Sequence, residues 1–444
     1  MQQESEVVSR LLPAIRCVTV VESSDLLTGV AVFDSVRYEP SVSLLEADVV
    51  LVDGRGLRAL RAEDAAVVEQ WAALDVRPPL IVTDDVPADL RARANGTINS
   101  TDVSGRFFDP KTWNPSRGSG HRDAESVGRS IVEVDDFGSV VAGPFDPTST
   151  RSLELAANGT PFVETDLSVL STDRLRRLGV AYRRFAFEHR HAELERLTKQ
   201  LMLDTPPLRP RVAALLVSNR PEDAVAAIEQ IGRQRYRPLE LIVGCHGFSS
   251  ALATNAISHV PTDIPVSVFE FSPELSLGQC LNECISTSGA HVIAKMDDDD
   301  HYGPSYLTDA VQSLEYSGVS IIGKATSYTY VESEDRTVLR RPGYEEILYN
   351  GSPTGATLVW ARGVWERNPF PHRTIGEDYS FLRGARLLGE EVYVNARFEF
   401  VYRRRRSGNT WQAADELFTG GSGVGWDGDH PSNADVPDLD PMPP

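Results

Sequence analysis

The sequence lacks several features that would define whole classes of protein. Only four of its 444 residues are cysteine, which is too few for a scaffold held together by disulfides. No stretch reaches the ~18–20 apolar residues that a membrane-spanning helix needs. The amino terminus, MQQESEVVSR, has no basic segment followed by an apolar one, so we expect no signal peptide. A cytoplasmic protein is therefore expected, with peripheral binding at the inner face of the membrane as the alternative.

Basic residues are scarce relative to acidic ones. The chain has 44 Lys and Arg against 64 Asp and Glu, and its formal net charge is −20. Because that charge repels polyanions, we do not expect nucleic acid as a partner. Apolar residues make up 41% of the chain and charged residues 24%, which is typical of a globular protein with a sizeable core. Cys280 and Cys284 lack a second ligand pair at zinc spacing, so they are expected to be buried free thiols in a reducing compartment.

Residues 1–203 are predicted to form an α/β domain. Apolar segments at 14–22, 47–53 and 78–85 are typical of strands, and residues 61–74 have helical spacing. Strands that alternate with helices indicate a small parallel sheet of Rossmann-like type. Residues 95–129 are rich in Gly, Ser, Asn, Asp and Arg and are predicted to be a long loop. Two helices are expected after it, one ending at Asn158-Gly159 and a charged one over about 180–201.

A proline-rich linker at 204–210 separates this domain from a second one, predicted at 211–412. The second domain begins with alternating strands and helices, and its later strand-like segments indicate a mixed sheet. After Trp411 the chain has no Lys or Arg and is rich in Gly, Pro and Asp. We therefore predict that residues 413–444 form an acidic, disordered tail.

Four consecutive aspartates, Asp297 to Asp300, follow the apolar run 292–294, which is typical of a buried strand. Neighbouring carboxylates about 4–5 Å apart repel each other by roughly 3–4 kcal/mol at an effective dielectric constant near 20. Ligands of open α/β sheets bind beyond the carboxyl ends of strands. The run therefore predicts a site for a hard divalent cation that holds a phosphorylated ligand. The alternative is that the aspartates only solvate a loop.

Several motifs occur in a fixed order around this run. They are VSNRPE at 217–222, RQRYRPLELIV at 233–243, the glycines and asparagine at Gly278, Asn282 and Gly289, the D-x-D pattern, GED at 376–378, and RRRRSGNTW at 403–411. In this order they resemble the family 2 glycosyltransferases, which have the GT-A fold. The resemblance covers residues 211 to about 411. It implies an α/β protein in which a GT-A domain with a mixed sheet follows the Rossmann-like one.

The resemblance also implies a reaction. Such an enzyme transfers a sugar from a nucleoside diphosphate sugar to a hydroxyl of a glycan, a protein or a small molecule, with Mn²⁺ or Mg²⁺ stabilising the diphosphate. Asp299 corresponds to the metal-binding member of D-x-D, and Asp297 lies near the ribose and the metal. Asp298 and Asp300 stay open as alternatives because a run of four aspartates leaves the register ambiguous by one residue.

Asp378, the last residue of GED, is the expected catalytic base for the acceptor hydroxyl, and Glu377 is the alternative. Direct displacement assisted by one base inverts the anomeric centre, so an inverting enzyme is expected. The simpler interpretation of either carboxylate is stabilisation of a helix N-terminus through the helix dipole.

Other side chains are expected to contact the donor. Arg403 to Arg406 could bring guanidinium groups to the diphosphate, although strand alternation lets only two of the four face one site. They could equally form a solvated basic edge, and Lys295 could bind phosphate or pair with an aspartate. His301 and His372 are possible further metal ligands. The expected donor-binding residues are Ser218, Asn219, Arg220, His246, Asn282, Lys295, Asp297, Asp298, Arg404, Arg406 and Trp411.

The sequence departs from the family after the second strand. Many family members have V-D-D-G there, whereas this chain has GCHG, with Cys245 and His246. An imidazole can contact a base or a ribose, but it cannot accept hydrogen bonds from both ribose hydroxyls as a carboxylate does. A catalytically silent nucleotide-sugar or glycan-binding scaffold is therefore the alternative function. The acceptor pocket is expected in the loops between about Thr326 and Arg373, with Trp360 and Trp365 as possible sugar-stacking platforms. Core packing is the simpler role for either tryptophan.

The first domain has a second, shorter resemblance. TSTRSLELAANGTPFV, at 148–163, is similar to a segment in the nucleotide-binding half of GT-B glycosyltransferases. In that family the position of Glu154 contacts the donor ribose. The half-domain that would complete a GT-B cleft is missing, so we expect a non-catalytic module that is structural, positions the acceptor or forms a homo-oligomer.

Overall fold

The structure is a computed structural model of the whole chain, and it describes part of it. The described residues are 15–20, 33–37, 49–52, 57–58, 60–74, 80–83, 86–94, 96–98, 131–134, 138–142, 144–146, 150–164, 170–200, 209–406, 415, 418 and 424–439. The described residues divide into two compact units, one within residues 12–208 and the other within residues 209–444. Most of the predicted linker at 204–210 lies outside the described residues.

The N-terminal unit contains a five-stranded sheet in the order β2-β1-β3-β4-β5, in which every neighbouring pair is parallel. Val68, Trp71 and Leu90 pack from the two helices against β3 and β4. The predicted parallel sheet is confirmed. Its two edge strands, which are short or rich in polar residues, were not predicted. The elements are β1 (Ile15–Val20), β2 (Phe33–Arg37), β3 (Val49–Val52), α2 (Ala62–Ala72), β4 (Leu80–Thr83), α3 (Ala88–Arg93) and β5 (Gly96–Ile98).

The rest of this unit is a three-stranded sheet, β6-β7-β8, with two helices. Its elements are β6 (Ile131–Val134), β7 (Gly138–Ala142), α5 (Thr150–Ala157), β8 (Phe162–Val163) and α6 (Thr172–Gln200). As predicted, α5 ends in a turn at Asn158 and Gly159, where Gly159 has a φ of +81° that favours glycine. The side chain of Glu154 lies outside those that the structure describes. Among the described helices, including the 29-residue α6, none has the length and apolarity to cross a bilayer.

The C-terminal unit is built on an eight-stranded mixed sheet in the order β11-β10-β9-β12-β18-β14-β19-β17. Strands β11, β10, β9 and β12 run parallel to one another, and β18 runs antiparallel to both β12 and β14. This confirms the mixed sheet that the sequence indicated. The strands are β9 (Val212–Ser218), β10 (Leu239–His246), β11 (Val266–Phe271), β12 (Val292–Lys295), β14 (Ile321–Gly323), β17 (Ile347–Leu348), β18 (Val359–Ala361) and β19 (Val392–Val394).

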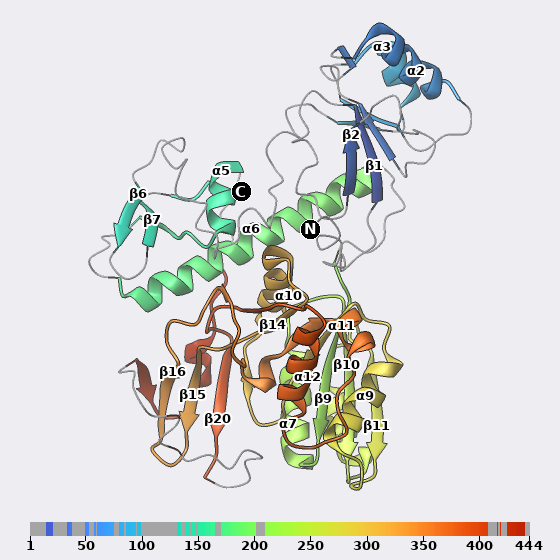
Figure 1. The fold of residues 1–444 in the computed structure, drawn as a ribbon. Helices are drawn as coiled ribbons and strands as arrows, with labels where there is room; N and C mark the ends of the chain where they lie inside the picture. Colours follow the sequence, from blue (N-terminus) through green and yellow to red (C-terminus); the bar gives the residue numbers. More distant parts are fainter. Residues whose placement is uncertain are drawn as a thin grey trace. The chain divides into compact units, whose positions relative to one another are not determined.

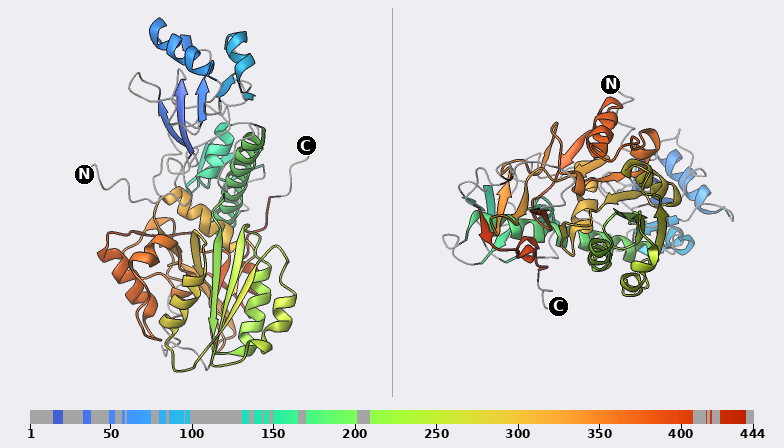
Figure 2. Two further views of the ribbon diagram at one scale, coloured as in Figure 1. Left: turned by 90° about the vertical axis from the view of Figure 1, so that its right-hand side faces the viewer. Right: turned by 90° about the horizontal axis from the view of Figure 1, so that it is seen from below.

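Helices cover this sheet because their apolar residues recur on one face (Figures 1 and 2). Leu281, Val364, Phe381 and Leu382 bring α9, α11 and α12 into one core cluster with strands β9, β12 and β18. The helices of this unit are α7 (Pro221–Gly232), α8 (Thr254–Ser258), α9 (Leu277–Thr287), α10 (Tyr306–Ser317), α11 (Arg362–Arg367) and α12 (Glu377–Leu387), with short 3₁₀ turns η7 (Ser250–Leu252), η8 (Gly355–Thr357) and η9 (Pro431–Ala434).

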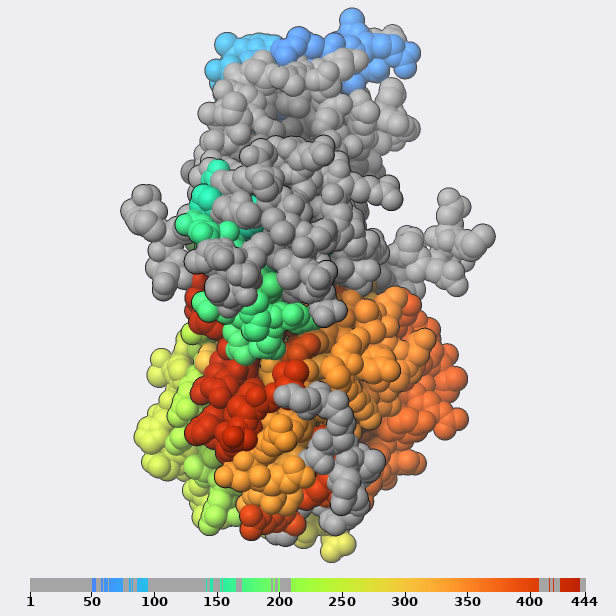
Figure 3. All heavy atoms as spheres, turned by 90° about the vertical axis from the view of Figure 1, so that its left-hand side faces the viewer, coloured from blue at the N-terminus to red at the C-terminus, as the bar shows by residue number. Residues whose placement is uncertain are grey.

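A second sheet of this unit, β13-β20-β15-β16-β21, corrects the prediction of a disordered tail for residues 424–439. In this part of the tail, which packs on the C-terminal unit in Figure 3, β21 pairs with β16 and Trp426 contacts the ring of Tyr328 at 4.7 Å between centroids. Composition suggested disorder, but the tail supplies an aromatic anchor and its acids pair with bases of the domain, as Asp438 does with Arg235 at 2.5 Å. The strands are β13 (His301–Tyr302), β15 (Ser327–Val331), β16 (Arg336–Arg340), β20 (Phe400–Arg404) and β21 (Gly425–Asp427).

Candidate active site

The aspartate run lies directly after β12, at the carboxyl end of the parallel strands β9 and β12. Its members alternate in environment. Asp297 and Asp299 line a cavity of about 490 Å³, whereas Asp298 and Asp300 are buried and do not line it. The structure therefore assigns Asp297 and Asp299 to the cavity side, which is the register that the D-x-D pattern favoured.

Asp297 is held from both its backbone and its side chain. Its amide N–H donates to the Tyr302 hydroxyl at 2.8 Å, and that hydroxyl donates to the Ala356 carbonyl at 2.7 Å. Its Oδ1 accepts a hydrogen bond from Lys295 Nζ at 2.7 Å. Tyr302, which the sequence analysis missed, thus connects the acidic run to the chain before β18.

Asp298 and Asp299 share one guanidinium. Arg220 Nη1 lies 2.9 Å from Asp299 Oδ2, and the same side chain is hydrogen-bonded to both oxygens of Asp298. Ser218, the last residue of β9, also donates to Asp298. Arg220 and Ser218, both predicted to contact the donor, thus lie next to the acidic run. Ser218 and Asp298 are buried against each other, however, which removes both from the predicted contact with the donor.

Asp300 was predicted as a metal ligand, and the structure contradicts that role. Its carboxyl is buried and its Oδ1 accepts a hydrogen bond from the backbone N–H of Arg403 at 2.8 Å. Burial, followed by the charge of Asp299, raises the pKa of Asp300 well above the usual range. The Asp300 carboxyl does not line the cavity, and its hydrogen bond connects the run to β20 instead.

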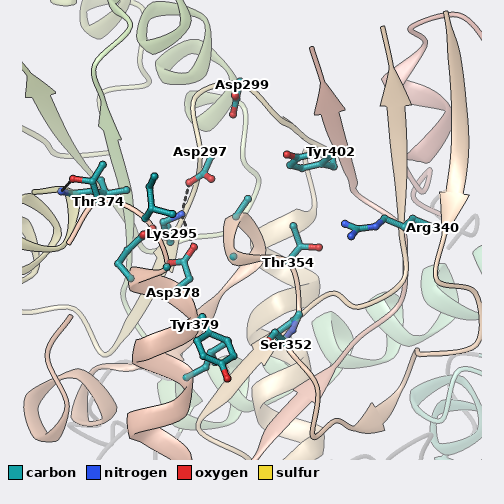
Figure 4. Close-up of a pocket in the computed structure, with 18 of the residues that line it drawn as sticks. Lys295, Asp297, Asp299, Arg340, Ser352, Thr354, Thr374, Asp378, Tyr379 and Tyr402 are labelled. Carbon is teal, nitrogen blue, oxygen red and sulfur yellow. Dashed lines mark hydrogen bonds and ion pairs between the residues drawn. The ribbon is translucent and has the colours of Figure 1, made fainter. Parts of the chain in front are cut away.

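Lys295 links the aspartate run to the GED motif, 83 residues later in the chain. Its Nζ lies 2.7 Å from Asp297 Oδ1 and 3.3 Å from Asp378 Oδ2. Figure 4 shows these three side chains converging on one wall of the cavity. Burial by itself would lower the pKa of Lys295, but Asp297 and Asp378 outweigh it and raise that pKa. Lys295 is therefore charged, and it brings together the two acidic groups that the sequence predicted to cooperate.

Two glycines, Gly376 and Gly355, allow Asp378 its position. It lies in the first turn of α12, which begins after Gly376 at a φ of +76°. A Cβ at Gly355, in η8, would collide with the Asp378 carboxylate, so only glycine allows this close approach. Asp378 Oδ1 is buried and accepts no hydrogen bond from any residue within the described ranges. Burial raises the pKa of Asp378, and Lys295 partly offsets the increase. Such a carboxylate is suited to accept a proton.

Glu377 lies beside Asp378 and is 5% exposed. Burial, and then the charge of Asp378, raise its pKa from 4.5 to about 7. A carboxyl with a raised pKa favours folding while it is protonated. Its contribution is therefore complete below pH 4.5 and is lost as the pH rises to about 7.

We expect Glu377→Gln to remove this pH dependence. The variant should match the wild type in free energy of unfolding near pH 4.5 and exceed it at pH 8, because the buried charge is gone. Urea denaturation at half-unit intervals of pH measures the difference, and exposed Glu274→Gln is the control. A difference between Glu377→Gln and wild type that stays constant from pH 4.5 to 8 would contradict the raised pKa.

The cavity residues fit a divalent cation. Lys295 and Arg220 form ion pairs with four carboxylates, namely Asp297, Asp298, Asp299 and Asp378, so negative charge exceeds positive charge in this group. Within the described part of the chain, no three His, Cys, Asp or Glu side chains are arranged to hold a metal by themselves. Asp297 and Asp299 would supply two ligands, and phosphate oxygens and water would complete the shell, as is usual for Mg²⁺ in phosphate sites.

Several residues predicted to bind the donor have other partners. Asn282 uses both ends of its amide to hold Trp365 and Phe370, at 2.8 to 3.0 Å. Arg404 pairs with Asp415 at 3.0 Å, and Arg406 donates to Glu332. None of these three predicted residues lines the cavity. The amide of Asn282 and the guanidinium of Arg404 thus have partners within the domain, away from the cavity.

The remaining described residues that were predicted to bind the donor or a metal also do not line the cavity. Asn219 is exposed and His246 ends β10, and neither lines the cavity. His301 Nε2 lies 2.9 Å from Asp435 Oδ1, so its ring is paired with the C-terminal segment. His372 is exposed. Trp360 is fully buried in the core. Trp411 lies outside the described residues. Cys280 and Cys284 are buried free thiols, as predicted.

The far wall of the cavity contains residues that were not predicted one by one. Arg340, Arg341, Ser352, Thr354 and Tyr402 line it, from β16, the loop before β18, and β20. All but Tyr402 lie in the segment between Thr326 and Arg373 where the acceptor pocket was expected.

No protein-family model and no curated protein matches the chain. Solved structures resemble it weakly. The mannosyltransferase PcManGT from Pyrobaculum calidifontis, in complex with GDP-Man and Mn²⁺, has a TM-score of 0.37 and 16% identity over 51% of this chain and 67% of its own. S. aureus TarS 1–349 in complex with UDP-GlcNAc has a TM-score of 0.35 and 10% identity, over 47% of this chain and 63% of its own. S. aureus TarS is covered over 37% of its length. Similarity this partial identifies neither a family nor a reaction.

Proposed function

We propose that this protein is a metal-dependent, inverting glycosyltransferase of the family 2 type. It transfers a sugar from a nucleoside diphosphate sugar to a hydroxyl group, in the cavity of a GT-A-like C-terminal domain at 211–412. The observation that carries the proposal is the Lys295 bridge, because it joins the aspartate run and Asp378 on one wall of one cavity. A nucleotidyltransferase would instead need a glycine-rich basic loop after its first strand, which VSNRPE is not.

Each residue has a role that follows from its position. Asp299 and Asp297 would hold Mn²⁺ or Mg²⁺, which when bound supplies a Lewis acid for the diphosphate leaving group. Asp378 accepts the proton of the attacking acceptor hydroxyl. Lys295 keeps Asp378 and Asp297 in place and offsets their charge. Attack opposite the leaving group, assisted by one base, inverts the anomeric carbon. Glu377 is the second candidate for the base.

The N-terminal unit is proposed to be a Rossmann-like accessory module without catalysis of its own. Its parallel strand order, 2-1-3-4-5, is that of doubly wound nucleotide-binding folds and supports this assignment. The module would position the acceptor or join two copies of the chain.

A silent scaffold that binds nucleotide sugar or glycan is the second candidate. It is favoured by GCHG at the end of β10, where Cys245 is buried and no carboxylate follows the strand. The half-buried Asp378, paired with Lys295, argues for catalysis, because binding alone does not require a base.

Calorimetry and product analysis test the proposal together. UDP, GDP and dTDP are titrated into the full-length protein with and without Mn²⁺, and nucleotide sugars are then screened for metal-dependent hydrolysis or transfer. We expect one nucleotide to bind only with metal and its sugar to be released. Binding without turnover of any sugar would support the scaffold. Absence of both would refute the glycosyltransferase proposal.

A further inference from the structure

The far wall of the cavity is basic and rich in hydroxyl groups. Arg340 and Arg341 line it, together with the hydroxyl side chains of Ser352, Thr354 and Tyr402. Figure 4 shows Arg340 extending toward the cavity from β16, with Tyr402 and Thr354 between it and the Lys295 wall. One cavity therefore has an acidic wall and a basic wall.

Two consecutive strand residues do not normally line the same cavity, because side chains alternate along a strand. β16 ends at Arg340, and Arg341 has a φ of +48°, in the left-handed region that residues other than glycine rarely adopt. This change of conformation breaks the alternation, so that the side chains of both arginines line the cavity.

The left-handed conformation at Arg341 is held by a buried side chain. The hydroxyl of Thr326, which is fully buried, donates to the Arg341 carbonyl and accepts from the N–H of Tyr344 at 3.1 Å. Backbone strain of this kind persists only where the surroundings impose it, and it concentrates at binding sites. The Arg341 guanidinium donates to the carbonyl of Ser352 at 3.4 Å, which places it beside another residue of this wall.

Arg340 is also fixed in place. Its guanidinium lies 4.7 Å from the centre of the Phe418 ring, a cation–π distance. Burial, followed by the neighbouring charge of Arg341, lowers the pKa of Arg340. An anion between the two guanidinium groups would relieve that repulsion. Arginine forms paired hydrogen bonds with phosphate and carboxylate oxygens, and the hydroxyl groups nearby would complete such a site.

We propose that Arg340 and Arg341 form an acceptor subsite for an oxyanion, so that the natural acceptor carries a phosphate or a carboxylate beside the hydroxyl that is glycosylated. The inference rests on the proposed function and adds to it the chemical class of the acceptor. The donor diphosphate is the other possible source of the same chemistry, and Arg220 and Lys295 already provide cations beside the aspartate run.

Calorimetry with three matched sugars tests the subsite. Glucose, glucose 6-phosphate and glucuronate are titrated into the full-length protein, first alone and then after saturation with Mn²⁺ and UDP or GDP. We expect both charged sugars to bind with and without nucleotide, and at least about tenfold more tightly than glucose. Arg340→Gln/Arg341→Gln should abolish this preference and leave the nucleotide affinity unchanged. Arg336→Gln, an exposed change on the same strand, is the matched control.

Arg341→Gly tests whether misfolding, and not loss of the guanidinium, causes a loss of the preference for charged sugars. Glycine adopts a positive φ without strain, so this variant should unfold at or above the wild-type temperature and still lose most of the preference for charged sugars.

Equal binding of glucose and the charged sugars to the wild type, or an unchanged preference in both arginine variants, would overturn the proposal. Loss of nucleotide binding in the double variant, with no charged sugar bound to the nucleotide-saturated protein, would assign the arginines to the donor and also overturn it. If no nucleotide binds but the arginine-dependent preference remains, the transferase proposal fails and the oxyanion site stands.

Discussion

Asp378→Asn is expected to lower kcat by about 10²–10⁴-fold, the usual contribution of a positioned general base. Asparagine keeps the shape of the side chain and can still accept the hydrogen bond from Lys295, which lies 3.3 Å from Asp378 Oδ2. It cannot take a proton from the acceptor. Nucleotide affinity and the melting temperature should therefore change little. Hydrolysis or transfer from the nucleotide sugar identified in the screen, followed over time, measures the loss.

The matched control is Asp263→Asn, which removes one exposed carboxylate paired with Arg237 at 2.5 Å, remote from the cavity residues in sequence. If the kcat of Asp378→Asn were within threefold of the kcat of Asp263→Asn, Asp378 would not be the base. Glu377→Gln would then be tested for the larger loss, because Glu377 lines the same cavity and is the other carboxyl of the helix terminus.

Asp299→Asn is expected to weaken metal-dependent nucleotide binding by about a hundredfold or more, since even residues that only orient a metal ligand contribute 10- to 100-fold. Asp299 lines the cavity and carries the charge that would face the cation. Arg220 would keep Asp298 as a partner, so the local packing should survive. Titration of the nucleotide in saturating Mn²⁺ measures the change, and EDTA added to the wild type should produce the same loss.

Asp300→Asn gives the sharpest comparison, because it alters the neighbouring member of the same run. The Asp300 carboxyl is buried, has a raised pKa and accepts the Arg403 N–H, all of which an amide tolerates. Metal-dependent binding should therefore persist in this variant. If Asp299→Asn and Asp300→Asn lost metal-dependent nucleotide binding equally, the four aspartates would act together as one acidic patch. If only Asp300→Asn lost it, Asp300 and not Asp299 would be the metal ligand.

The general location of the site could be predicted from the sequence for a simple reason. An apolar run followed by carboxylates fixes a buried strand with charges at its end, since both depend only on local composition. Asp297, Asp299, Glu377, Asp378, Arg220 and Lys295 all line the cavity, and each was among the predicted residues.

Predictions that depended on a side chain's partners in the folded structure were less successful. Arg404 was expected at the diphosphate and pairs with Asp415, and Asn282 holds Trp365 and Phe370. The residue types were compatible with either role. A polar side chain binds whichever complementary group the fold places nearest to it, and that group is not apparent from its own segment.

The sequence by itself determined the mixed α/β character, the acidic strand end and the second acidic group at GED, because hydrophobic periodicity and charge are properties of short segments. Only the tertiary structure decided that Lys295 joins the two acidic groups, that Asp297 and Asp299 rather than Asp298 and Asp300 line the cavity, and that two arginines form the opposite wall. These features depend on burial and on the backbone conformation at Arg341, which arise when distant segments pack together.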